Sequence, residues 1–292
     1  MDKQSHTIVH VKTTDGYSLH GLLSEGVNKD TIIIHMHGSA GNFYVSTFFP
    51  ELRTFADAGI CSFLSTNSRG TGVYDVEVGT KYRGSAIEIF EECVLDIDAW
   101  IEYALERKYT NIILEGHSFG TNKIQYYALQ GKYRDKIKAL ILLGFTDSYG
   151  TQLKYLARIN KENSAYLQEA NNLLQQGKPL QLLSDPYANC GELPQTAQSY
   201  ASLMSDNSEL SNVLPLRNGT TLPNYSKINI PMLGVVGDRN EYTVIPISDA
   251  IALMKKENKH ATIVQITDCS HGYEGKETEL GVIIKKFIET IS

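Results

Sequence analysis

The chain of 292 residues is 42% hydrophobic and 21% charged, and its formal net charge is −6. This composition is typical of a globular protein that can bury a large core, so wholesale disorder is excluded. No run of basic residues is longer than two, which argues against nucleic acid as a partner because phosphate binding needs clustered Lys and Arg.

Targeting and membrane segments are not visible in the sequence. The N-terminal stretch MDKQSHTIVHVKTTDGYSLHG has no apolar segment after its charges, so we expect no signal peptide. The apolar run Ile137–Phe145 is interrupted by Lys138, and no run approaches the ~20 residues that span a bilayer. We therefore expect a cytoplasmic protein without a membrane partner. No two cysteines are close, and we expect no metal, no cofactor and free thiols at Cys61, Cys93, Cys190 and Cys269.

Short apolar runs alternate with longer amphipathic stretches. The predicted strands, in chain order, are Ser18–Leu23, Thr31–Met36, Ile60–Ser65, Asn111–Glu115, Ile137–Leu143, Pro231–Val236 and Thr262–Ile266. The helices predicted between and after them are Glu88–Leu105, Phe119–Leu129, Ser248–Lys255 and Glu279–Ile291. Runs such as TIIII and ALILLG are apolar on both faces, as parallel strands covered by helices are. The order predicts an α/β fold with a mostly parallel central sheet flanked by helices.

The stretch of residues 146–226 breaks this alternation, because it contains no convincing strand. Helical patterns cover Gln152–Gln176 and Gln195–Met204, and the stretch is too long for a simple connection. We therefore expect a helical cap at residues 146–226, inserted before the strand Pro231–Val236. The core would then consist of residues 1–145 and 227–292.

The pentapeptide GHSFG, centred on Ser118, joins a predicted strand to a predicted helix. A sharp strand-to-helix turn exposes a serine hydroxyl, and the flanking glycines relieve the crowding of such a turn. The context predicts that Ser118 is a nucleophile rather than a helix-capping serine. The backbone N–H of Phe119, the next residue, would help to stabilise an oxyanion.

The loop HGSAGN, after the strand Thr31–Met36, is expected to supply the second oxyanion donor. Its glycines let the backbone bend, and we expect the donor to be Ser39 N–H, with Ala40 as the alternative. A serine nucleophile also needs a base. His271, in the loop CSHGY after the last predicted strand, has the position that a general base requires.

The motifs HGSAGN, NSRGTG, GHSFG, GDRNEY and CSHGY occur in the order found in the α/β-hydrolases, and the chain resembles that family over nearly its whole length. The resemblance implies the α/β-hydrolase fold, with a helical cap inserted before the strand that bears the catalytic acid. The run GSAIEIFEECVLDIDAWIEYAL is similar to a small serine-esterase subgroup that includes siderophore-type ester hydrolases. It implies a serine esterase or thioesterase.

The acid is the point at which the sequence departs from the family. The family loop reads G-x-x-D, but this chain has Asn240 in place of the aspartate. Four alternatives stay open: Glu241, Asp238, Asn240 itself, or Asp147 after the preceding strand. An amide can orient an imidazole but lacks the charge that stabilises imidazolium, so Asn240 alone would leave turnover lower by up to ~10⁴.

The expected reaction is cleavage of an ester, thioester or amide of a small molecule through an acyl-enzyme on Ser118. An alternative is transfer of the acyl group to an amine or alcohol, which a dry cap would favour. A second alternative is a ligand-binding protein with a degenerate triad. Lys123 and Arg69 are expected either to meet an anionic substrate group or to pair with carboxylates.

Overall fold

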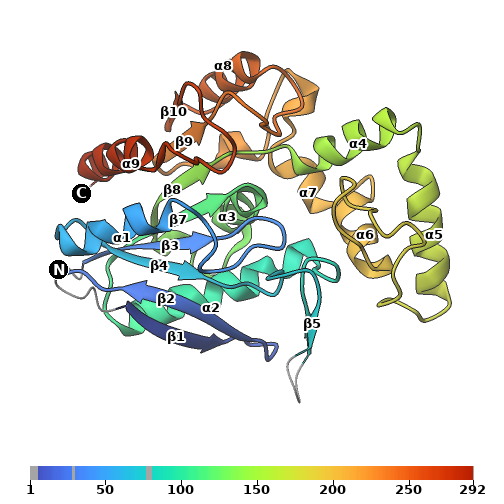
Figure 1. Ribbon diagram of the computed structural model, residues 1–292, viewed down its shortest axis with the longest axis horizontal. Coiled ribbons are helices and arrows are strands. Elements are labelled where there is room, and N and C mark those ends of the chain that lie inside the picture. Colours follow the sequence, from blue (N-terminus) through green and yellow to red (C-terminus); the bar gives the residue numbers. More distant parts are fainter. Residues whose placement is uncertain (1–5, 28–29, 77–80, 292) are drawn as a thin grey trace.

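The computed structural model describes residues 6–27, 30–76 and 81–291 (Figure 1). Within these residues, eight strands form one sheet in the order β1-β2-β4-β3-β7-β8-β9-β10. Their bounds are β1 His6–Lys12, β2 Ser18–Ser24, β3 Thr31–Met36, β4 Ser62–Thr66, β7 Asn111–His117, β8 Ile137–Leu143, β9 Met232–Val236 and β10 Ala261–Gln265. The short strands β5 (Asp75–Val76) and β6 (Tyr82–Arg83) pair separately.

The sheet is parallel from β4 to β10 and antiparallel only where β2 pairs with β1 and with β4. The prediction of a mostly parallel sheet is therefore confirmed. Register places Met36, the last residue of β3, opposite Gly116 of β7. The loop that follows β3 consequently begins beside the GHSFG turn, at the carboxyl edge of the sheet where α/β proteins bind ligands.

Helices cover both faces of the sheet: α1 Phe49–Asp57, α2 Cys93–Glu106, α3 Phe119–Gln130, α8 Ile247–Glu257 and α9 Glu277–Ile291. Side chains of β3 alternate between the faces. Ile33 packs in the core beneath α1 and α9, whereas Ile32 and Ile34 pack in the core beneath α2, α3 and α8. This two-sided burial explains why all six residues of β3 are buried and four of them are apolar.

Residues 146–226, which we call the cap segment, contain α4 (Ser148–Arg158), α5 (Asn163–Gln175), α6 (Ala197–Met204) and α7 (Glu209–Val213). Figure 1 shows α4, α5 and α6 beyond the carboxyl ends of the central strands. The segment contacts the core through backbone hydrogen bonds, such as that from Thr196 N to Ala86 O at 2.8 Å.

Several elements differ from the sequence-based prediction, and α1 and α7 are among those that were not predicted. β1 was not predicted, because Val9 is the one residue of HTIVHVK that is buried and the apolar signal is weak. The predicted helix Gln152–Gln176 is two helices, separated near Asn160, whose φ of 54° ends α4. The predicted helix Glu88–Leu105 begins as an α-helix only at Cys93, because Glu88 O accepts a hydrogen bond from Ser199 Oγ and Ile89 is extended.

None of the helices in the described ranges is both long enough and apolar enough to cross a membrane. Residues 1–5, part of the stretch in which we expected no signal peptide, lie outside the described residues.

Candidate active site

Ser118 occupies a strained turn between β7 and α3. Its φ of 55° and ψ of −125° lie in a region that non-glycine residues rarely adopt. A Cβ atom on Gly120 would collide with Met36 O, and one on Gly116 would collide with Gly120 O. Both glycines are therefore required by close packing, as the sequence pattern indicated, and the turn presents Ser118 to a cavity.

His271 lies in the loop after β10 and contacts the Glu241 side chain. Its Nδ1 donates to Glu241 Oε2 at 2.7 Å, and the Glu241 side chain is fully buried. The other carboxylate oxygen, Oε1, accepts a hydrogen bond from Gly237 N at 2.8 Å. These bonds fix the imidazole with its proton on Nδ1, so Nε2 is left as an acceptor. Nε2 is buried and has no hydrogen-bond partner among the described residues.

The other three acid candidates have different partners. Asp238 accepts hydrogen bonds from Asp268 N and Cys269 N, which lower its pKa. Asp147 caps α4 through Gly150 N and forms an ion pair with Arg217 at 2.7 Å, and burial raises its pKa. Neither carboxylate contacts His271; each instead holds a loop or helix end in place.

Asn240 explains why the contact is made one residue later than the family pattern implies. Its side chain is exposed and its φ is 58°, in the left-handed region that asparagine tolerates. The chain turns at this residue, and the following side chain, Glu241, points inward to His271. The extra methylene of glutamate spans the remaining distance.

The loop after β3 lies directly against Ser118. A Cβ atom on Gly38 would come within 2.9 Å of Ser118 Cβ, so the close approach depends on glycine. Ala40 has a φ of 51°, and Gly41 N donates to Gly38 O at 3.2 Å. Ser39 and Phe119 both line the same cavity as Ser118. Ser39 N–H makes no hydrogen bond within the described ranges, as a free oxyanion donor requires.

His37 locks the shape of this loop. Its Nδ1 donates to Gly38 O at 2.7 Å, and its Nε2 accepts from Ser68 N at 3.2 Å. Burial lowers its pKa to about 3, so the ring is neutral and keeps one tautomer. The HGSAGN loop is thereby attached to the NSRGTG loop, a contact that no sequence pattern predicts.

His117 supports the His271 loop from the neighbouring strand. Its Nε2 donates to the backbone oxygen of His271 at 2.8 Å, and the two rings lie 4.9 Å apart. Burial lowers the pKa of His117 to about 3, so the neutral ring can donate from Nε2. The motif G-x-S-x-G leaves this position open, and the sequence therefore gave no signal for the role.

Tyr273 attaches the same loop to the sheet. Its hydroxyl donates to Val235 O at 2.8 Å and accepts from Gly144 N at 2.7 Å. Val235 belongs to β9, and Gly144 directly follows β8, so one side chain bridges two strand ends and the CSHGY loop.

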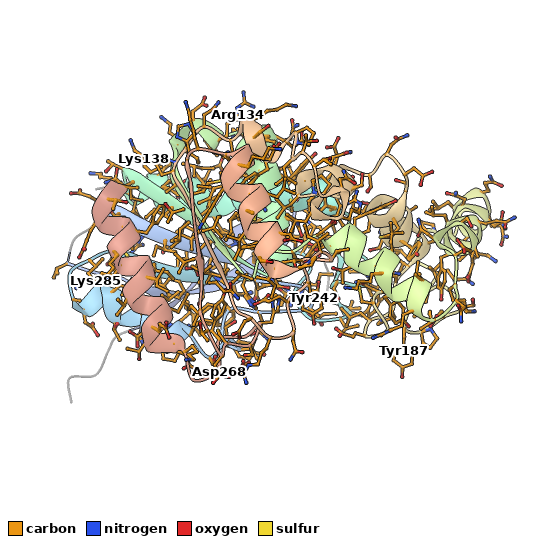
Figure 2. The ribbon with its side chains drawn as sticks, turned by 90° about the horizontal axis from the view of Figure 1, so that it is seen from above. Arg134, Lys138, Tyr187, Tyr242, Asp268 and Lys285 are labelled. Carbon is orange, nitrogen blue, oxygen red and sulfur yellow. The ribbon has the colours of Figure 1, made fainter. Side chains whose placement is uncertain are left out.

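A cavity of about 380 Å³ lies over Ser118, between the core and the cap segment. Apolar and aromatic side chains from both parts line it: Val45, Phe48, Leu193, Tyr200, Leu203, Met204, Leu210 and Tyr242. Figure 2 shows Tyr242 near the junction of core and cap segment, with Lys138 and Lys285 toward the other end of the core. The Tyr242 ring packs edge-on against the His271 ring, with the ring centroids 4.7 Å apart. The size and lining suit a small organic molecule.

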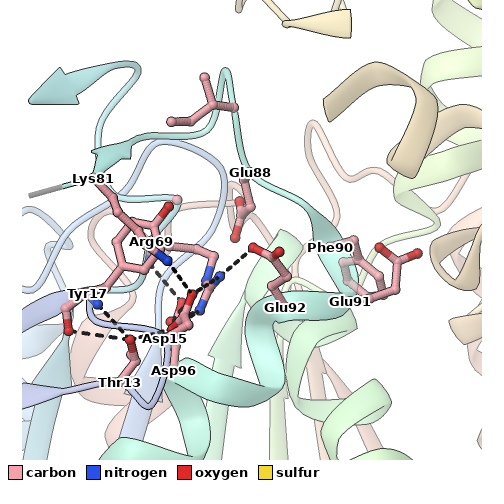
Figure 3. A network of polar contacts seen from close by, with 12 residues as sticks. Thr13, Asp15, Tyr17, Arg69, Lys81, Glu88, Phe90, Glu91, Glu92 and Asp96 are labelled. Atoms are coloured by element: carbon pink, nitrogen blue, oxygen red, sulfur yellow. Dashed lines mark hydrogen bonds and ion pairs between the residues drawn. The ribbon is translucent and has the colours of Figure 1, made fainter. Parts of the chain in front are cut away.

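Arg69 and Lys123 are both paired with carboxylates. Arg69 is bound by Asp15, Glu92 and Asp96, as Figure 3 shows, with Arg69 Nη2 3.0 Å from Asp96 Oδ1. Lys123 is fully buried and lies 2.5 Å from Glu88. Of the two alternatives drawn from the sequence, pairing with carboxylates is the one that the structure shows.

The chain matches one family of protein sequences and is similar to several solved structures of esterases. The family model described as "Protein of unknown function (DUF1749)" matches residues 64–280, whereas no curated protein sequence matches the chain. The esterase Pf2001 of Pyrococcus furiosus has a TM-score of 0.61 at 15% identity, over 98% of this chain and 91% of that chain. Est1E from Butyrivibrio proteoclasticus, solved with ferulic acid bound, has a TM-score of 0.64 at 19% identity, over 97% and 98% of the chains.

A highly thermostable carboxyl esterase from Bacillus coagulans, in complex with glycerol, has a TM-score of 0.67 at 14% identity. The similarity covers 99% of both chains. Together with the sheet order, these similarities confirm the α/β-hydrolase fold that the motifs implied.

Proposed function

We propose that this chain, which belongs to the family described as "Protein of unknown function (DUF1749)", is a serine hydrolase that cleaves small-molecule esters or thioesters. One observation carries the proposal. Ser118, on its strained turn, shares a cavity with His271, whose Nδ1 is bound by the buried Glu241 carboxylate. The names of its structural neighbours, which are esterases, support the same class of reaction.

Acylation begins with attack of Ser118 Oγ on the substrate carbonyl carbon. As the C–O bond forms, His271 Nε2 takes the hydroxyl proton, and the negative charge of Glu241 stabilises the resulting imidazolium. The negative charge on the former carbonyl oxygen is stabilised by the N–H groups of Ser39 and Phe119. The imidazolium then protonates the leaving alcohol or thiol, and the acyl group stays on Ser118.

Deacylation repeats these steps with water as the nucleophile. His271 Nε2 takes a proton from the water molecule while the oxygen of that water attacks the acyl carbon. His271 then returns the proton to Ser118 Oγ as the carboxylic acid leaves. Glu241 does not itself take up the proton. No cofactor is needed for any of these steps.

The decisive test is Ser118→Ala in pure protein, assayed with 4-nitrophenyl esters. We expect kcat/KM to fall by about 10⁵- to 10⁶-fold, while the melting temperature stays near that of the wild type. Ser226→Ala, at an exposed serine far along the chain in the cap segment, is the matched control and should keep full activity. Full esterase activity in the Ser118→Ala protein would disprove the proposal.

A fluorophosphonate probe separates the remaining alternatives. Labelling of Ser118 with turnover of esters supports hydrolysis, whereas labelling without turnover on a broad ester panel indicates a ligand-binding protein. Addition of an amine or alcohol at rising concentration then tests acyl transfer. If free acid remains the sole product at every concentration, transfer is excluded.

A further inference from the structure

One end of the cavity is lined by polar side chains that take no part in the proposed reaction. Ser85, Glu88 and Gln195 all line the cavity, with only 4%, 4% and 1% of their surface exposed. Ser85 and Glu88 come from the turn-rich segment before α2, and Gln195 comes from the cap segment. The two segments are joined along their length by hydrogen bonds, including Gln198 Nε2 to Ile87 O.

The Glu88 carboxylate is held in a fixed place. It lies 2.5 Å from Lys123 Nζ, which in turn lies 5.0 Å from the centre of the Phe119 ring. A Cβ atom on Gly70 would collide with Glu88 Oε2, so the carboxylate rests directly on the Gly70 backbone. Figure 3 shows Glu88 on the segment that leads to Phe90, near the Arg69 cluster. This end of the cavity is therefore on the Phe119 side of the nucleophile.

Two further polar atoms at this end are left without partners. Gln195 Nε2 donates to Ser85 O at 3.3 Å, which fixes the amide and leaves Oε1 as a free acceptor. Gln195 Oε1 and Ser85 Oγ are buried and have no hydrogen-bond partner among the described residues. A buried polar atom without a partner lowers stability, so at a cavity wall it calls for water or a ligand group that enters from the cavity.

We propose that Ser85, Glu88 and Gln195 form a subsite for a hydroxyl group of the substrate. The subsite offers a carbonyl oxygen, a hydroxyl and a carboxylate, so it accepts hydrogen bonds and calls for a donor. Lys123 neutralises the charge of Glu88, so a neutral donor fits better than an ammonium group. A substrate carboxylate would face acceptor oxygens and be excluded.

The inference rests on the proposed hydrolysis and adds the class of substrate: an ester that carries a hydroxyl group away from the cleaved bond. The hydroxyl can belong to the acyl part or to the alcohol part, and the chemistry of the subsite is the same for both. Substrates of each kind distinguish the two sources.

The experiment compares matched esters that differ only at the far end. In the acyl arm, 4-nitrophenyl esters of three to eight carbons end in hydroxyl, methyl, ammonium or carboxylate. In the alcohol arm, butyrate monoesters of diols are compared with butyrates of simple alcohols. We expect the hydroxyl-ended ester of the best length to exceed its methyl-ended counterpart at least tenfold in kcat/KM, in one arm. The carboxylate-ended ester should be the poorest.

Variants of the subsite residues test whether the preference for hydroxyl-ended esters depends on these side chains. Ser85→Ala and Gln195→Met should each reduce the hydroxyl-to-methyl ratio of kcat/KM by about three- to tenfold. Ser46→Ala, at a half-buried serine elsewhere on the cavity wall, should leave that ratio unchanged. Because Ser85 Oγ has no partner among the described residues, Ser85→Ala should not lower the melting temperature. An equal loss for both esters would overturn the assignment.

Binding to the Ser118→Ala protein separates this inference from the proposed function. Calorimetry with the intact esters should show tighter binding of the hydroxyl-ended ester whether or not the wild type turns it over. Preference in binding without turnover would refute hydrolysis and retain the subsite. Turnover without a hydroxyl preference in either arm would refute the subsite and retain hydrolysis.

Discussion

Two histidine–carboxylate pairs in this molecule have nearly the same geometry and very different surroundings. His271 Nδ1 lies 2.7 Å from Glu241, and His35 Nδ1 lies 2.8 Å from Glu115. In the first pair, His271 lines the cavity beside Ser118 and its side chain is 17% exposed, whereas Glu241 is fully buried behind it. The second pair links β3 to β7 inside the core, where both side chains are fully buried.

Burial sets the charge of the second pair. It lowers the pKa of His35 to about 3 and raises the pKa of Glu115 to about 8, so both groups are neutral between these values. The rings of Phe48, Phe49 and Phe63 surround His35. A hydrogen bond between a histidine and a carboxylate therefore does not by itself indicate a catalytic site. The pair needs a nucleophile and a substrate beside it.

The same substitution in each pair gives the largest expected contrast. Glu241→Gln keeps the shape of the side chain but removes the charge that stabilises imidazolium, and we expect kcat to fall by about 10³- to 10⁴-fold. Glu115→Gln, the matched control, should change kcat by less than about threefold, because Glu115 does not reach the cavity. Steady-state kinetics with one 4-nitrophenyl ester measures both. Equal losses in the two variants would contradict the distinction.

The buried pair of His35 and Glu115 should make the free energy of unfolding depend on pH. The pKa of Glu115 is higher in the folded state than the ordinary 4.5, so its contribution is full below pH 4.5 and is lost as pH rises toward 8. The pKa of His35 is lower than the ordinary 6.5, so its contribution is full above pH 6.5 and is lost as pH falls toward 3. The two effects offset each other between pH 4.5 and 6.5.

From pH 6.5 to 8 only the loss from Glu115 remains, which amounts to about 2 kcal/mol at one proton per molecule. Glu115→Gln should flatten this part of the stability curve. Urea unfolding at half-unit intervals of pH measures the free energy. If the variant and the wild type lose the same stability over this range, the neutral state of Glu115 is refuted.

His117, the last residue of β7, connects the His271 loop to the turn of Ser118, and its removal should have an intermediate effect. His117→Phe deletes the donor to His271 O, and we expect kcat to fall about tenfold, which corresponds to about 1.4 kcal/mol. His117→Gln, which retains an N–H donor, should recover part of the loss. The rate of fluorophosphonate labelling of Ser118 should follow kcat. A melting temperature that falls while labelling stays at the wild-type rate would indicate a purely structural role.

The smallest effect is expected at the position where the family has its aspartate. Asn240→Asp should change kcat/KM by less than about twofold, because residue 240 is exposed and Glu241 already makes the contact with His271 Nδ1. The same change made in the Glu241→Gln protein should fail to restore activity. Recovery in the double variant would show that the loop can rewind and that the acid is not tied to Glu241.

Much of the fold and part of the site could be predicted because they follow from local sequence. Strands such as TIIIHM, buried on both faces, are visible as apolar runs, and GHSFG requires glycines wherever it forms this turn. The identity of the residue that contacts His271 could not be predicted. It depends on a single left-handed residue, Asn240, which shifts the inward-facing side chain by one position.

Features that depend on contacts between residues distant in the sequence could not be predicted either. The contact between His117 and His271 spans 154 positions, and no local pattern signals it. The break between α4 and α5 depends on how the cap segment folds back on itself, since Gln152–Gln176 keeps a helical pattern throughout. The start of α2 was misplaced for a similar reason, because the residues before it pair with the cap segment.

The Tyr273 bridge has a consequence for how the protein loses activity on heating. Its hydroxyl accepts from Gly144 N and donates to Val235 O, two backbone groups of adjacent strands that also hydrogen-bond to each other at 2.9 Å. The Tyr273 side chain is fully buried in the core, so the loop that carries His271 cannot detach without withdrawing this ring, and it opens together with the sheet rather than ahead of it. Loss of turnover and loss of secondary structure should therefore share one midpoint temperature, and the Gly144 amide should exchange with deuterium only on global unfolding.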